Sequence, residues 1–172
     1  MFKKYLILFA TLFIAQSTMA NGIFDNPTTP WDVAEKLPPL DNISCKFTQE
    51  KSFKNKTVKS GGNFEFIKDK GVIFETLYPV KSTSTYTSEG NKQINGIITG
   101  IANKNYSYIN KNFNLFYISS ATDWTLALKP KEKSPAFGQL ESIIINGTNN
   151  INKMIIKTTN GVTTEINFYC GK

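Results

Sequence analysis

The feature that most constrains the fold is an alternation of apolar and polar residues, which runs from Ile43 almost to the end of the chain. A period of two is typical of strands that bury one face, and Gly, Pro and Asn at the breaks mark turns. Asn160-Gly161 is a strong two-residue hairpin signal. The predicted strands cover residues 43–53, 58–67, 72–78, 82–87, 93–101, 124–129, 140–145, 153–159 and 162–170. Regular hairpins of this kind predict a mainly β (α+β) fold, with one curved antiparallel sheet or open barrel.

Three stretches depart from regular alternation. Thr29 can cap a short helix that starts at Pro30 and ends before Pro38-Pro39, and its residues Trp31, Ala34 and Leu37 are expected to pack on the domain. Gly61-Gly62 predicts a bulge inside its strand, and the limits of 93–101 are blurred by two further glycines. Residues 112–119 fit either one or two helical turns or an irregular strand.

The first twenty residues predict export from the cytoplasm. Lys3 and Lys4 form a basic start, residues 5–15 form an apolar core, and Thr18-Met19-Ala20 fits a cleavage site, which is the three-part pattern of a signal peptide. The apolar core is too short for a membrane-spanning helix, which needs about 20 residues. We therefore expect a signal peptide over 1–20 and one soluble periplasmic domain over 21–172.

The basic residues are unusual because all 20 are lysine, and the chain also lacks histidine. Histidine-based catalysis, Ser-His-Asp triads and histidine metal sites are therefore excluded. The lysines are scattered, so the net charge of +7 indicates a solvated basic surface and no nucleic-acid partner. A weak attraction to anionic lipid head groups stays open.

Catalytic motifs are also lacking in the sequence. GxSxG, P-loop, GxGxxG and HExxH patterns are absent, and the 13 carboxylates form no metal-like cluster. Glu65 and Glu75 alternate with phenylalanines on their strands, so we expect them to face solvent rather than to form a glycosidase pair. The chain is predicted to be no enzyme and to need no metal or cofactor.

Cys45 and Cys170 are the two cysteines of the chain. An even number of cysteines in an oxidising compartment favours a disulfide. Both residues fall on the apolar face of their predicted strands, so both thiols point inward. Two buried free thiols are the alternative.

Large aromatic residues are abundant for this length. These residues either fill the core or line a ligand cavity, and composition alone favours the filled core. These aromatic residues include Phe47, Phe53, Phe64, Phe66, Phe74, Phe113, Phe116, Phe137, Phe168 and Trp124.

The order of short motifs along the chain is more specific than their number. The series consists of Phe47-Thr48-Gln49, residues 60–66 (SGGNFEF), residues 72–76 (VIFET) closed by Pro79, residues 87–90 (TSEG), Trp124-Thr125-Leu126 and residues 161–168 (GVTTEINF). This series resembles the outer-membrane lipoprotein carrier protein family, LolA, and in particular its LolA-like branch. The likeness covers roughly residues 43–168.

The resemblance implies an incomplete antiparallel barrel whose short helices form a lid over an apolar cavity. It further implies a monomeric periplasmic carrier of lipoprotein, lipid or glycolipid acyl chains, loaded by an inner-membrane releasing transporter and unloaded at an outer-membrane receptor. The cavity residues implied are Phe47, Phe64, Phe66, Val72, Phe74, Trp124, Leu126, Leu128, Ile145, Ile156, Ile166 and Phe168. The lid residues implied are Lys68, Phe113 and Phe116.

Three positions depart from the family pattern. Lys68 replaces an arginine that latches the lid, Val72 replaces a cavity aromatic, and Phe74 replaces a strand tryptophan. Lysine lacks the planar fork of arginine, which puts the latch in question. The alternative to a carrier is a periplasmic protein-binding or scaffolding domain with a filled core, and an envelope-lipid hydrolase is the weakest hypothesis.

Overall fold

The computed structural model describes residues 22–89 and 92–171. The predicted signal peptide over 1–20 lies outside the described residues. The strands are β1 (Pro27–Thr28), β2 (Ile43–Phe53), β3 (Lys56–Ile67), β4 (Gly71–Tyr78), β5 (Ser82–Ser84), β6 (Phe113–Ser119), β7 (Trp124–Pro130), β8 (Leu140–Gly147), β9 (Ile151–Thr158) and β10 (Val162–Cys170). The helices are the 3-10 turn η1 (Ile23–Asp25), α1 (Pro30–Lys36), α2 (Lys92–Ala102) and α3 (Ser107–Asn112).

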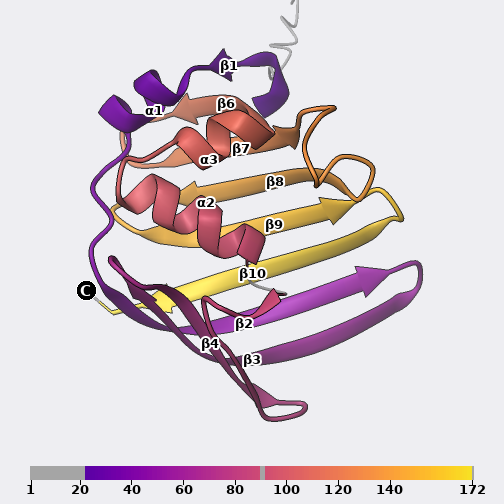
Figure 1. Cartoon of the computed structure of the whole chain (residues 1–172). Coiled ribbons are helices and arrows are strands. Elements are labelled where there is room, and N and C mark those ends of the chain that lie inside the picture. Colours follow the sequence, from indigo (N-terminus) through magenta and orange to yellow (C-terminus); the bar gives the residue numbers. More distant parts are fainter. Residues whose placement is uncertain (1–21, 90–91, 172) are drawn as a thin grey trace, which may run out of the picture.

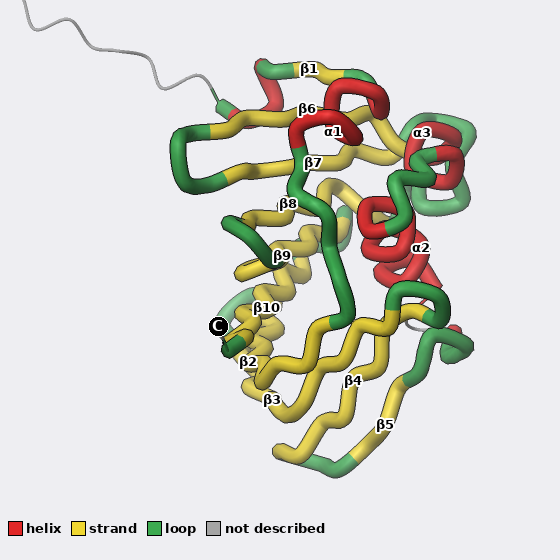
Figure 2. Tube along the Cα trace, turned by 90° about the vertical axis from the view of Figure 1, so that its left-hand side faces the viewer, coloured by secondary structure: helices red, strands yellow, loops and turns green. Residues whose placement is uncertain are grey.

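The ten strands form one antiparallel sheet in the order β1-β6-β7-β8-β9-β10-β2-β3-β4-β5 (Figure 1). Its first and last strands are not paired with each other, so the sheet stays open. Figure 2 shows the sheet bent into a C, with α2 and α3 on its concave side. The predicted fold class, an incomplete antiparallel barrel with a few short helices, is confirmed.

The strand order explains why helices cover the concave face. The chain leaves β5 at one edge of the sheet and next pairs as β6, beside the opposite edge. The connection between β5 and β6 must therefore cross the opening of the C, and it contains α2 and α3 (Figure 2). On this path α2 contacts β4, while α3 contacts α2 and β6.

Most predicted strands are confirmed because their alternation reflects one buried and one exposed face. In β2, for example, Cys45 and Phe47 are buried while Ser44 and Lys46 are exposed. The predicted bulge is also confirmed, because the register between β3 and β4 shifts at Gly61-Gly62. A Cβ atom on Gly62 would lie 1.9 Å from the carbonyl oxygen of Glu75, so no larger residue fits there without moving the backbone.

The first helix begins where its capping signals place it. The Thr29 hydroxyl accepts a hydrogen bond from the Asp32 N–H at 3.2 Å, and the Asp32 carboxylate accepts from the Thr29 N–H at 3.3 Å. These two reciprocal bonds form a capping box ahead of Pro30. The expectation that Trp31 packs on the domain is wrong, since its side chain is 80% exposed. Leu37 is buried and Ala34 is partly buried, as expected.

The prediction of a strand over 93–101 is also wrong, because these residues lie in α2. Ile94, Ile97, Ile98 and Ile101 recur at i, i+3, i+4 and i+7, which places them on one face of a helix. The last three of these isoleucines are buried and Ile94 packs against them. Burial of this face outweighs the low helix propensity of isoleucine and glycine.

Two smaller differences concern strand limits. The strand predicted over 82–87 ends at Ser84, and a turn follows. Of the two alternatives for 112–119, the strand is correct, since β6 starts at Phe113 directly after α3. No helix in residues 22–89 and 92–171 is long and apolar enough to cross a membrane.

A disulfide joins Cys45 to Cys170, as predicted, with their Cα atoms 4.3 Å apart. The two residues are direct partners in the pairing of β2 with β10. The bond closes a loop of 125 residues, which contains most of the domain. Closing so long a loop strongly reduces the conformational freedom of the unfolded chain.

We expect the double variant Cys45→Ala, Cys170→Ala to have a free energy of unfolding lower by about 4–5 kcal/mol, because the loop-closure entropy returns to the unfolded state. Urea titration monitored by circular dichroism measures the change. A loss below about 1 kcal/mol would show that β2–β10 pairing holds the loop without the bond.

Candidate functional site

The predicted cavity residues all lie in one apolar cluster on the concave side of the sheet. They come from β2, β3, β4, β7, β8, β9 and β10. All except Ile156 are at most 8% exposed, and Ile156 is partly buried and packs against the others. The sheet therefore brings together residues that are up to 121 positions apart in the sequence (Phe47 and Phe168).

Four phenylalanines form the centre of the cluster where β2, β3, β4 and β10 meet. The ring centroid of Phe64 lies 4.9 Å from that of Phe74 and 4.7 Å from that of Phe168. Phe47 meets Phe74 edge to face at 5.2 Å. These spacings are those of packed aromatic side chains. In this conformation the predicted cavity residues fill the space between themselves, and their role in binding lipid stays a prediction.

The helical cover is tied to the sheet by asparagine side chains near the β3–β4 turn. Asn95 of α2 accepts a hydrogen bond from the Val72 N–H through its Oδ1 atom at 3.0 Å. Asn103, just after α2, donates from Nδ2 to the carbonyl oxygen of Lys68 at 3.1 Å. Sequence reasoning missed both asparagines, because neither stands in a recognisable motif.

The predicted lid residues are placed differently from one another. Lys68 lies in the β3–β4 turn with an exposed side chain, and its backbone makes the contacts with Asn103 and with Asn42. Phe113 and Phe116 lie in β6 and not in a helix. Phe113 is buried in the core, and Phe116 meets Phe24 edge to face at 5.4 Å.

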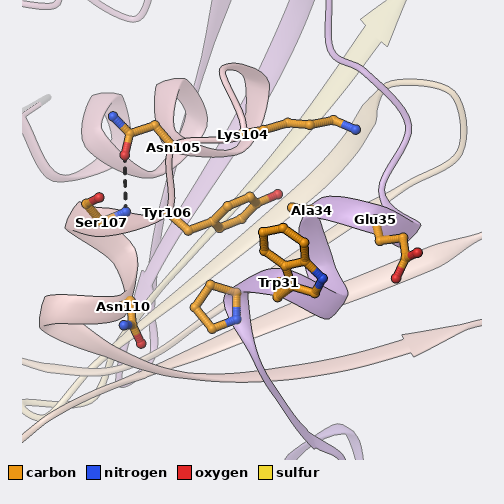
Figure 3. Close-up of a pocket in the computed structure, with 9 residues that line it drawn as sticks. Trp31, Ala34, Glu35, Lys104, Asn105, Tyr106, Ser107 and Asn110 are labelled. Carbon is orange, nitrogen blue, oxygen red and sulfur yellow. Dashed lines mark hydrogen bonds between the residues drawn. The ribbon is translucent and has the colours of Figure 1, made fainter.

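A pocket of about 590 Å³ lies between α1 and the connection from α2 to α3 (Figure 3). Its volume falls within the usual range of small-molecule sites. Pro30, Trp31, Ala34 and the charged Glu35 line it from α1, whereas the Tyr106 ring and several polar side chains line it from the α2–α3 connection and the start of α3. The lining residues are Pro30, Trp31, Ala34, Glu35, Lys104, Asn105, Tyr106, Ser107 and Asn110.

Trp31 forms the apolar wall of this pocket and leaves most of its indole uncovered. Covering a side chain of this size is worth on the order of 4 kcal/mol. Capping of α1 by Thr29 and Asp32 fixes the helix start, so Trp31 is held at the pocket rather than in a loose terminus. An apolar ligand group that packs against Trp31 would therefore gain part of this free energy.

Tyr106 forms the inner side of the pocket and belongs to the hydrophobic core, with 6% exposure. Figure 3 shows its ring reaching from the α2–α3 connection towards Ala34. Its hydroxyl is buried and, within the described residues, has no hydrogen-bond partner. Burial raises the pKa of Tyr106 to about 12, so the hydroxyl keeps its proton at neutral pH. A buried donor without a partner is costly, typically about 1–3 kcal/mol.

Comparisons with known proteins give no family and only a distant structural likeness. No protein-family model matches the chain, and no curated protein matches its sequence. Among solved structures, the chain is similar to a LolA superfamily protein from Nitrosomonas europaea, with 9% sequence identity and a TM-score of 0.37. The similarity covers 82% of this chain and 91% of that one. At this level, it says nothing about what this chain binds.

The unpartnered hydroxyl predicts that Tyr106→Phe raises the free energy of unfolding by about 1 kcal/mol at neutral pH. Alkaline pH gives a second readout. Because the folded pKa lies above the unfolded value of about 10, the unfolded chain loses this proton first, and stability falls as the pH rises from 10 towards 12. Tyr106→Phe should reduce that fall.

Urea titrations from pH 7 to pH 12 measure both effects, with Tyr169→Phe as a control at an exposed tyrosine. A lower stability of Tyr106→Phe at neutral pH would show that the hydroxyl makes a useful contact in the free protein.

Proposed function

We propose that this protein is a carrier of lipid acyl chains, which it holds between the concave face of its sheet and its helices. The proposed cargo is a lipoprotein or another lipid or glycolipid. The proposed partners are an inner-membrane releasing transporter and an outer-membrane receptor, with the carrier acting as a monomer in the periplasm. The proposal includes no catalytic step and no cofactor.

The observation that carries the proposal is the construction of the concave side. Its apolar surface is continuous across seven strands, yet helices and loops cover it, namely the α2–α3 crossing, α1 and the segment from α1 to β2. The α2 part of this cover can shift without breaking any strand pairing, because the side-chain bonds of Asn95 and Asn103 tie it to the β3–β4 region, whereas Lys131 ties α3 through the carbonyl oxygen of Asn112. Each such bond contributes only about 1 kcal/mol net.

The energy of acyl-chain transfer explains why such a cover must be loose. Each CH₂ group removed from water contributes about 0.8 kcal/mol, so one chain of about sixteen carbons represents roughly 12 kcal/mol. This gain is large enough to displace the side chains that fill the closed form. If opening the cover costs a comparable free energy, the net free energy of binding stays small, so that the cargo can be released again.

The disulfide supports a location outside the cytoplasm. Bonds such as Cys45–Cys170 persist in oxidising compartments and are rare in the reducing cytosol. A signal peptide over 1–20, which the sequence predicts, would deliver the chain to such a compartment.

A protein-binding domain is the second candidate, and the packed state of the core favours it. Its binding surface would be the apolar tip at the end of β4, where Leu77, Tyr78 and Val80 are 44%, 48% and 72% exposed. Such a domain would have no reason to open its helices.

Native mass spectrometry of the protein purified from the periplasm separates the two candidates. A carrier should arrive with an additional mass in the range of a lipid, which organic extraction removes. An unmodified mass, together with no uptake of a fluorescent fatty acid, would contradict the carrier and favour the binding domain.

Gly71→Ala tests whether the cover controls entry. Gly71 has a φ of 126°, and a Cβ atom there would lie 2.0 Å from Asn95 Oδ1. The substitution should push α2 off β4 and lower stability by about 2–3 kcal/mol. Stopped-flow uptake of a fluorescent fatty acid should become several-fold faster, because less of the barrier to opening remains.

Gly138→Ala is the matched control, since Gly138 has a φ of 79° but nothing within 4 Å of the added Cβ. It adds backbone strain of about 1 kcal/mol without touching the cover. Equal uptake rates in both variants would show that α2 does not gate the site.

A further inference from the structure

We propose that the pocket between α1 and the α2–α3 connection binds the acidic head group of a single-chain amphiphile, with the Tyr106 hydroxyl and the Lys104 ammonium group as its partners. The inference rests on the proposed carrier function and names the part of the cargo that is recognised outside the core. Tyr106 belongs to both the pocket and the core cluster, so a head group held here is next to the space proposed for its chain.

The Tyr106 hydroxyl determines the kind of atom that fits. It is buried, unpartnered within the described residues and protonated at neutral pH. Figure 3 shows Ala34 of α1 next to the Tyr106 ring, so we expect a slight shift of α1 to let an oxygen acceptor reach this hydroxyl. Carboxylate and phosphate oxygens are the strongest such acceptors, since charged hydrogen bonds are shorter and stronger than neutral ones.

Lys104 adds a positive charge on the same side of the pocket. It follows α2 in a left-handed backbone conformation, with a φ of 52°, and its N–H is held by the carbonyl oxygen of Ile101. Figure 3 shows its side chain extending above Tyr106 towards α1. Lys104 takes part in none of the ion pairs found in residues 22–89 and 92–171, so its ammonium group is available for an anion.

Glu35 determines which side of the pocket an acidic head group should occupy. It lies on α1, beyond Ala34 from Tyr106, and carries the negative charge of the lining. An acidic head group is repelled by Glu35 and attracted by Lys104, so it should lie on the side of the α2–α3 connection. The adjoining CH₂ groups then run along Trp31 and Pro30, which supply the apolar wall.

The chain offers a built-in reporter for this site because it has two tryptophans in opposite settings. Trp31 is 80% exposed at the pocket, whereas Trp124 is 5% exposed and donates from Nε1 to the Thr148 carbonyl oxygen. A ligand in the pocket should shift the emission of Trp31 to shorter wavelength and leave that of Trp124 unchanged. Trp31→Phe should therefore abolish the shift.

The experiment titrates the mature, disulfide-bonded protein with oleate, oleoyl lysophosphatidate and oleyl alcohol, each below its micelle concentration. We expect both acidic probes to bind at least tenfold more tightly than oleyl alcohol, with the stronger of the two indicating a fatty-acid or a phospholipid source. Tyr106→Phe should weaken oleate binding about tenfold, and Tyr108→Phe, a tyrosine outside this pocket, should not.

Charge variants test the head group independently of folding. Lys104→Gln should weaken oleate binding several-fold, Glu35→Gln should strengthen it, and neither should change binding of oleyl alcohol. Lys54→Gln is the matched control, because Lys54 is also an exposed lysine with a left-handed backbone, at a φ of 51°, but lies in the β2–β3 turn.

The outcomes separate this inference from the proposed function. If native mass spectra show bound lipid but Trp31 emission does not shift, the proposed head-group pocket is wrong and the proposed carrier function stands. The same conclusion follows if lipid is bound but Tyr106→Phe and Lys104→Gln bind oleate as wild type does. Equal affinity for oleate and oleyl alcohol would overturn the acidic head group. Failure of every probe and every purified sample to show bound lipid would overturn both.

Discussion

The pairing of β2 with β10 is the interaction on which the rest of the structure depends. The sheet consists of one group of strands from β2 to β5 and another made of β1 and β6 to β10, and within the described residues these groups pair only through β2 and β10. The pairing extends over nine residues from Val162 to Cys170, and the Cys45–Cys170 disulfide fastens its end. Because this contact joins the two ends of the domain, loop closure makes it slow to form and costly in entropy until the bond is made.

The same topology produces the candidate site. With β2 and β10 at the centre, the consecutive strands β5 and β6 fall towards opposite edges, and the connection between them has to span the open side of the sheet. The topology therefore requires the α2–α3 segment to cross the open side of the sheet, whatever its function. Its placement over an apolar face gives a cover whose helices rest on β4 and β6, near the two edges. A cover attached at the edges, over a face that strand alternation makes apolar, is a geometry suited to opening.

The sequence was informative wherever one residue type determines a local conformation. Alternation predicted β2 with its observed ends, Thr29 and Pro30 predicted the start of α1, and Gly61-Gly62 predicted the bulge. It was misleading in α2, where glycines and β-branched isoleucines suggested an interrupted strand although their spacing was helical. That spacing identifies the helix when the positions of the apolar residues are compared with a period of 3.6 as well as with a period of two.

The candidate pocket could not be predicted in the same way, because its character depends on contacts between segments. No local pattern distinguishes Tyr106 from the other tyrosines, although its hydroxyl is buried and has no partner among the described residues. Trp31 was expected to pack on the domain because so short a helix is not stable alone, but α1 buries Val33 and its C-cap residue Leu37 and leaves Trp31 exposed.

Both Trp31 and Tyr106 depart from the arrangement that would be most stable for the free protein. A large aromatic left in water and a hydroxyl left without a partner each lower stability, and a phenylalanine or a smaller residue would avoid the cost. The two departures lie on opposite sides of one pocket, and a single amphiphilic ligand would relieve both at once, covering the indole with the CH₂ groups next to its head and accepting from the hydroxyl with the head itself. Because one bound ligand would remove both the exposure of the indole and the missing hydrogen bond of the hydroxyl, ligand binding explains the two features more simply than two unrelated packing defects do.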